Sequence, residues 1–130
     1  MKPRSFAVIA GFATACALSP TDLGRCSGPF PLTVDQASSL SFSWTPGDCP
    51  VHTLAVLEGP SVKWYLFTAN EALNGLTAPV QYGQVPGPAF TSSQADFLWV
   101  GIPYRVQLTA LTRQGREVIV AETTFVKQAH

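Results

Sequence analysis

Short runs in which apolar and polar residues alternate recur along the chain from about residue 27, and turn-forming residues separate them. Alternation with a period of two places successive side chains on opposite faces of a strand. The clearest run is 39–45, where Leu40, Phe42 and Trp44 point one way and small hydroxyl residues point the other. No stretch between the runs is long enough for the helix that joins parallel strands. The pattern therefore predicts an all-β antiparallel sandwich of about seven or eight strands.

The predicted strands end at Gly, Pro, Asn or Asp residues, which favour turns. They span residues 30–34, 39–45, 52–57, 62–67, 79–84, 95–99, 104–111 and 117–126. One helical turn is expected at 69–73, and residues 113–115 (Arg-Gln-Gly) are expected to form a hairpin turn. In the strand at 62–67, we expect Val62, Trp64 and Leu66 to share one face.

Composition limits the class of protein. Apolar residues make up 46% of the 130 residues and charged residues 12%, which is too apolar for a disordered chain. Eight basic residues balance eight acidic ones, and no basic run occurs, so electrostatics give no support for nucleic-acid binding. The length suits one domain of ordinary size.

The first residues have the layout of a secretory signal peptide. Lys2 and Arg4 precede an apolar, uncharged stretch at 6–15, and small residues surround Cys16. The apolar stretch is shorter than the roughly 20 residues that span a bilayer. A buried N-terminal element of the domain is the alternative, but the basic start and the small-residue end favour a signal peptide at 1–15.

Two kinds of cleavage fit this signal. Residues 13–16 (Ala-Thr-Ala-Cys) resemble a bacterial lipoprotein box, although Ala13 stands where Leu is usual, and the resemblance implies lipidation of Cys16. Ordinary cleavage before Cys16 or before Leu18 fits as well. We favour the lipoprotein, with 16–26 as a short tether. Because Ala17 rather than Asp follows the cysteine, the resemblance implies the outer membrane; a periplasmic or secreted protein is the alternative.

The odd number of cysteines supports this view of the N-terminus. Three cysteines are present, and an exported chain seldom keeps free thiols. If Cys16 carries lipid or is removed with the signal, Cys26 and Cys49 remain as an even pair. We therefore expect a Cys26–Cys49 disulfide, the alternative being two unpaired thiols.

Two segments resemble the fibronectin type III family. Residues 39–46 resemble its second strand, whose tryptophan, here Trp44, lies in the core. Residues 98–104 resemble its corner, Leu-x-Pro-Gly-Thr-x-Tyr: Leu98, Gly101 and Tyr104 keep the spacing, while Val and Ile stand at the Pro and Thr positions. Residues 105–110 then continue as the family's sixth strand does. The resemblance implies one immunoglobulin-like sandwich domain over 27–127.

This topology gives specific expectations. The structural core would include Trp44, Leu98, Gly101 and Tyr104. The Tyr104 ring would be buried and its hydroxyl would bond to nearby backbone, while Gly101 would allow the tight turn. In a hairpin of the first two strands, a Cys26–Cys49 pair would centre the turn between Ala37 and Ser38, where the alternation breaks. Both cysteines would then lie at the same end of the sandwich.

Catalytic and metal-binding patterns are missing from the sequence. His52 has no nucleophile motif around it, and we expect it to face solvent on its strand. The acidic residues Asp48, Glu58, Asp96 and Glu122 are scattered singly, and neither His nor Cys residues cluster as ligands do. We therefore predict no enzyme activity, no metal and no cofactor.

Aromatic residues are the one suggestive feature. Five aromatic residues exceed what one core stripe needs: Trp64, Tyr65, Phe67, Tyr82 and Trp99. Adjacent residues on a strand face opposite ways, so one of Trp64 and Tyr65 faces outward. A possible binding surface for a protein or a carbohydrate consists of Trp64, Tyr65, Phe67 and Trp99, unless these rings merely cover a second sheet face. We predict an exported, non-catalytic binding or scaffolding module at the cell envelope, with membrane contact only through a lipid on Cys16. A small envelope enzyme or inhibitor, or a subunit that packs through an edge strand at 64–67, is the alternative.

Overall fold

The structure is a computed structural model that describes residues 26–69 and 74–129, and every regular element in these ranges is a β-strand. The strands are β1 (Leu32–Asp35), β2 (Ser41–Trp44), β3 (Thr53–Glu58), β4 (Ser61–Thr68), β5 (Val80–Gln81), β6 (Ala89–Thr91), β7 (Pro103–Leu111) and β8 (Glu117–Val126). The prediction of an all-β chain with about eight strands is confirmed.

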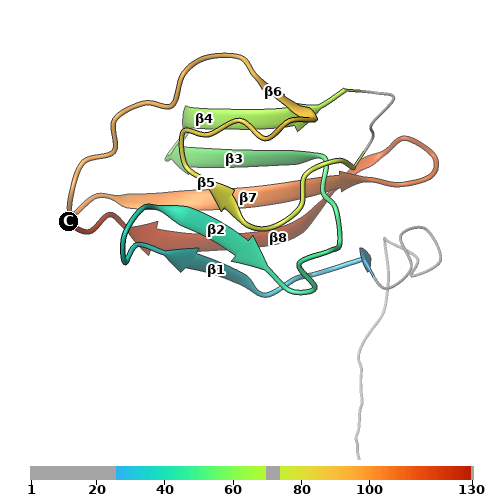
Figure 1. The fold of residues 1–130 in the computed structure, drawn as a ribbon, viewed down its shortest axis with the longest axis horizontal. Coiled ribbons are helices and arrows are strands. Elements are labelled where there is room, and N and C mark those ends of the chain that lie inside the picture. Colours follow the sequence, from blue (N-terminus) through green and yellow to red (C-terminus); the bar gives the residue numbers. More distant parts are fainter. Residues whose placement is uncertain (1–25, 70–73, 130) are drawn as a thin grey trace, which may run out of the picture.

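The strands form two antiparallel sheets (Figure 1). The smaller sheet has the order β1-β2-β5 and the larger one β6-β4-β3-β7-β8. Side chains that alternate along each strand fill the space between the sheets, as the burial pattern of β2 shows. Rings from both sheets meet there: Phe125 lies 5.9 Å from Phe42 and 5.8 Å from Tyr104, measured between ring centroids.

The two sheets also meet along one side, where β1 lies against β8 (Figure 1). The Phe30 N–H donates to the Val120 carbonyl at 2.7 Å, and Gln36 exchanges hydrogen bonds with the backbone of Val126 and Gln128. Gly28 has a φ of 73°, and a Cβ at this position would lie 2.8 Å from the Val120 oxygen. Only glycine permits this close approach of the chain to β8.

Most predicted strands are confirmed, but the strand predicted at 95–99 is wrong and β6 was not predicted. Residues 95–99 form no strand, because their backbone groups bond elsewhere: the Asp96 N–H donates to the Lys63 carbonyl at 3.0 Å and the Trp99 N–H to the Tyr104 hydroxyl at 2.8 Å. The unpredicted strand β6 pairs with Leu66–Thr68 of β4 instead. The strand expected at 79–84 is reduced to Val80–Gln81, and the helical turn expected at 69–73 lies largely outside the described residues.

Strand β4 differs from the prediction in two ways. Trp64 and Leu66 point inward as expected, but Val62 is 54% exposed. The register shifts between Val56 and Leu57, so Val62 pairs with Leu57 and leaves the inward face. β4 is flanked by β3 along its length and by β6 over Leu66–Thr68, so the edge expected at 64–67 is partly covered by another strand.

The sandwich has two distinct ends, which we name here. The disulfide pole holds Cys26, Cys49 and the β7–β8 hairpin, and it lies on the right in Figure 1. The groove pole, on the left, holds residues 97–100 and the C-terminal segment 127–129. β7 runs from one pole to the other, a length of roughly 30 Å for its nine residues.

Candidate functional site

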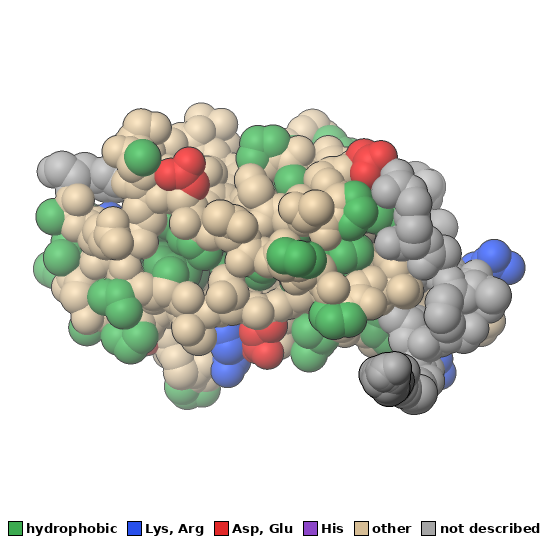
Figure 2. All heavy atoms as spheres, turned by 90° about the horizontal axis from the view of Figure 1, so that it is seen from below, with side chains coloured by type: hydrophobic (Ala, Val, Ile, Leu, Met, Phe, Trp, Pro, Cys, Tyr) green, Lys and Arg blue, Asp and Glu red, His purple; other side chains and the backbone are tan. Residues whose placement is uncertain are grey.

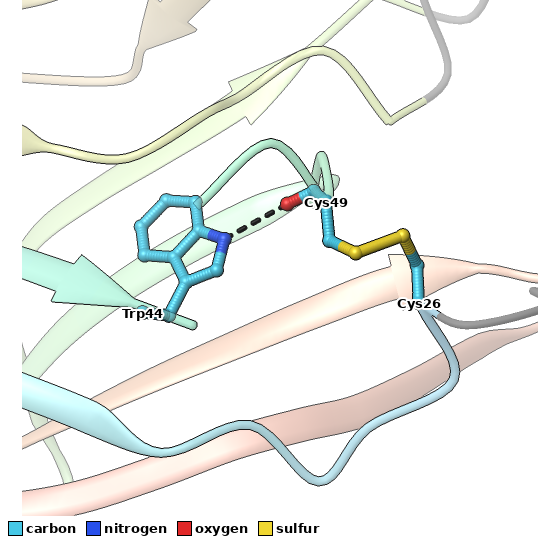
Figure 3. Close-up of a disulfide and its surroundings, with 3 residues drawn as sticks. All are labelled: Cys26, Trp44 and Cys49. Atoms are coloured by element: carbon cyan, nitrogen blue, oxygen red, sulfur yellow. Dashed lines mark hydrogen bonds between the residues drawn. A yellow bond between two sulfur atoms is a disulfide. The ribbon is translucent and has the colours of Figure 1, made fainter. Parts of the chain in front are cut away.

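The disulfide pole is built from buried and covalently linked parts (Figure 3). Cys26 and Cys49 form a disulfide with their Cα atoms 5.3 Å apart, as the sequence predicts. The Trp44 side chain, 3% exposed, donates from Nε1 to the Cys49 carbonyl at 2.8 Å. The pairing of Leu32 with Trp44 and of Val34 with Phe42 centres the β1–β2 turn on Ser38, half a residue from the expected position. Trp44 and the disulfide therefore serve folding, and neither is available to a ligand.

The corner before β7 also follows the prediction. Tyr104 is buried, and its hydroxyl accepts a hydrogen bond from the Trp99 N–H at 2.8 Å. Gly101 has a φ of 86°, a conformation that side-chain-bearing residues rarely adopt. Leu98 is buried and anchors the segment to the core. These contacts hold the backbone of the segment before β7, which forms one wall of the groove described next.

A groove of about 610 Å³ opens at the groove pole. Its walls come from the β1–β2 turn, β5, the segment before β7 and the C-terminal segment. The lining residues are Ser38, Ser39, Leu40, Gln81, Tyr82, Asp96, Phe97, Leu98, Val100, Lys127 and Ala129. The volume and the mixture of many apolar groups with a few polar ones are typical of ligand-binding sites.

Two aromatic side chains stand exposed at this groove. Phe97 is 72% exposed and Trp99 is 66% exposed, and their rings pack edge to face with centroids 4.9 Å apart. Val100 beside them is 58% exposed. In Figure 2, hydrophobic side chains are visible at this left-hand end of the molecule, as they are elsewhere on the same face. A fixed cluster of large apolar groups on the surface is the usual mark of an interaction site.

The backbone beneath these rings is held on both sides. The Tyr82 hydroxyl donates to the Asp96 carbonyl at 2.7 Å, and the Tyr82 ring packs against the buried Trp64 at 5.0 Å between centroids. Burial raises the pKa of the Tyr82 hydroxyl, and the nearby Asp96 carboxylate raises it further. Tyr82 therefore stays protonated and keeps donating to the segment that carries Phe97.

The predicted aromatic surface divides into three parts in the structure. Trp64 is 1% exposed and lies in the core, so it belongs to no binding surface. Tyr65 and Phe67 are half-buried on the outer face of the larger sheet, where Phe67 also contacts the exposed ring of Phe90. Trp99 alone lies at the groove pole, with Phe97 as its ring neighbour.

The sequence contained a signal for Phe97 that we did not use. Leu98 was expected to be buried, and in an extended segment the residues on either side of a buried one face outward. Phe97 and Trp99 were therefore predictable as an exposed pair. Phe90 was missed for a different reason, because β6 itself was not predicted.

Titratable groups form no catalytic arrangement that we can identify in residues 26–69 and 74–129. No group of three His, Cys, Asp or Glu residues that could hold a metal occurs in these ranges. His52 precedes β3 rather than lying on it, and its Nδ1 is 3.0 Å from the Thr68 hydroxyl, so it is not the free solvent-facing residue we expected. The Thr109 hydroxyl donates to the Glu117 carboxylate at 2.6 Å and accepts a hydrogen bond from the Thr53 hydroxyl, whose oxygen lies 3.5 Å from the same carboxylate oxygen.

Comparisons with known proteins add no family assignment. Neither the models of protein families, nor curated proteins, nor solved structures gave a match. Among the described residues, no helix is long and apolar enough to cross a membrane.

Proposed function

We propose that this chain is an exported, non-catalytic binding or scaffolding module of the bacterial cell envelope, built on a fibronectin type III-like domain. We further propose that it contacts its partner through the groove pole. The single observation that carries the binding function is the anchored, exposed pair of Phe97 and Trp99 beside the 610 Å³ groove.

The order of the strands supports the family proposal. If the short strand β6 is taken as an addition at the edge of the larger sheet, seven strands remain, which is the usual number for this kind of sandwich. The strand that carries Tyr104 is then the sixth, as the resemblance requires. The buried Trp44 and the bonded hydroxyl of Tyr104 agree with the roles that the family pattern implies.

The disulfide supports export, because such bonds persist in oxidising compartments. Cys16, the proposed lipid site, precedes the disulfide-bonded Cys26 by ten residues in the sequence. The intact, non-reduced mass of the product made in a Gram-negative host tests this: a chain that begins at Cys16 and carries lipid supports the anchor, and an untrimmed, reduced chain contradicts export.

The fold does not need the aromatic side chains of Phe97 and Trp99, and this favours a role for them in binding. Backbone groups of Asp96, Trp99 and Gly101 form hydrogen bonds to Lys63, Tyr82, Tyr104 and Lys127, and Leu98 supplies the buried contact. Phe97 and Trp99 could therefore be polar without loss of these interactions. Large aromatic side chains on a rigid, partly concave surface are the groups that contribute most to protein interfaces.

Site-specific photo-crosslinking in the producing cell tests this proposal. A benzophenone amino acid in place of Phe97 should give a covalent adduct at native expression level, because the reactive ring would lie within the interface. The same amino acid in place of Gln114, an exposed residue of the β7–β8 hairpin at the disulfide pole, is the matched control. Trp99→Ala should reduce the adduct at position 97. Equal labelling at both positions, or none at position 97, would contradict a binding role for the groove pole.

A further inference from the structure

The surface of the groove pole is complementary to itself, so a second copy of the chain can be its partner. An exposed aromatic pair, Phe97 and Trp99, lies at a groove that Phe97 lines together with Leu40, Tyr82 and Val100. A surface with exposed rings at a groove can pair with its own copy about a two-fold axis, so that rings of each copy contact the other copy's groove.

The charges at the groove have the same self-complementary arrangement. Asp96 and Lys127 both line it, and neither belongs to an ion pair among the described residues; the Lys127 ammonium donates only to the Gln128 carbonyl, at 2.7 Å. In a two-fold contact, Asp96 of one copy can meet Lys127 of the other, and the same pair forms twice.

We propose that the groove pole binds a second copy of this chain and forms a weak two-fold dimer. This inference rests on the proposed binding function and names its partner. In the dimer, the rings of Phe97 and Trp99 enter the partner's groove, and Asp96 and Lys127 pair across the axis.

The available area sets the strength of this contact. Aromatic side chains bury about 150–250 Å² each, so at their observed exposure Phe97 and Trp99 offer roughly 300 Å² per copy. With the recesses that receive them, a symmetric contact buries about 1,200 Å² in total, at the low end of specific interfaces. A reversible dimer is therefore expected rather than an obligate one.

Charge reversal tests the geometry directly. Sedimentation equilibrium of the full chain as the cell processes it, in density-matched detergent where it carries lipid, should show a monomer–dimer equilibrium below about 1 mM. Asp96→Lys and Lys127→Asp should each weaken association about tenfold or more, because like charges then face each other twice. The double variant D96K/K127D should recover most of the wild-type affinity. Unchanged urea midpoints would show that the variants fold normally.

Each outcome decides between the proposals. Loss in both single variants with recovery in the double variant supports the two-fold dimer. A wild-type chain that stays monomeric to about 1 mM, single reversals without effect, or a double variant that does not recover would overturn it. If the chain is monomeric but the crosslink at position 97 joins another molecule, the dimer fails and the binding function stands. If no crosslink forms either, both proposals fail.

Discussion

The two poles of the sandwich use tryptophan in opposite ways. At the disulfide pole, Trp44 is 3% exposed and its indole nitrogen donates to the carbonyl of a disulfide-bonded cysteine. At the groove pole, Trp99 is 66% exposed, and its hydrogen bonds are made by the backbone rather than by the side chain. The side chain of Trp44 is thus part of the folded core, whereas that of Trp99 is free to contact another molecule.

This contrast indicates a division of work along the domain. The disulfide pole closes the sandwich with a covalent bond, a buried indole and the bidentate hydrogen bonds between Asn74 and Leu111. The groove pole also has backbone hydrogen bonds, at Asp96, Trp99 and Gly101, but leaves the side chains of Phe97 and Trp99 in water. We therefore expect substitutions at the disulfide pole to change stability and substitutions at the groove pole to change association.

The largest expected effect is at Trp44. Trp44→Ala should lower the free energy of unfolding by about 3–5 kcal/mol, because it leaves a cavity in the core and removes the bond to the Cys49 carbonyl. Trp99→Ala is the matched control and should stay within about 0.5 kcal/mol of wild type. Urea denaturation of both variants measures the difference. Similar losses in the two variants would remove the distinction between the poles.

The disulfide should give the next largest effect. Replacing Cys26 and Cys49 together by Ser should destabilise the chain by about 3 kcal/mol under non-reducing conditions, since the bridge restricts the unfolded chain. In the presence of reductant, wild type and variant should unfold at closely similar urea concentrations. The thermal or urea midpoint under the two conditions is the measurement, and a variant equal to wild type without reductant would show that the bridge does not form.

Much of the fold was predictable because burial and periodicity coincide in it. β2 alternates cleanly, β7 does so from Pro103 to Leu108, and the inward residues of these stretches are those that the alternation indicated. Cysteine pairing was predictable from the number of thiols and from the hairpin register. These features depend on local pattern or on simple counting, and no distant contact overrides them.

The missed features depend on contacts between distant parts of the chain. Val62 leaves the core because the register of β3 and β4 shifts between Val56 and Leu57, and no local sequence pattern indicates this shift. The sequence of residues 95–99 resembles a strand, yet the Lys63 carbonyl and the Tyr104 hydroxyl accept hydrogen bonds from backbone N–H groups of this segment. The groove itself joins four separate segments, so only its aromatic members could be suspected from the sequence.

Tyr104 belongs to the core through its ring and to the groove pole through its hydroxyl, and its substitution should affect stability less than the loss of Trp44 or of the disulfide. Tyr104→Phe keeps the ring in the core but removes the acceptor for the Trp99 N–H, so it should cost about 1 kcal/mol in the free energy of unfolding. The local consequence should be clearer than the global one: the Trp99 amide should exchange its hydrogen faster, while core amides such as that of Val106 change only by the global amount. Because Trp99 would then be less fixed, association through the groove pole should also weaken. If the Trp99 amide exchanges as in wild type, the corner does not hold the aromatic pair, and the rigidity that distinguishes this pole must come from Tyr82 and Leu98 instead.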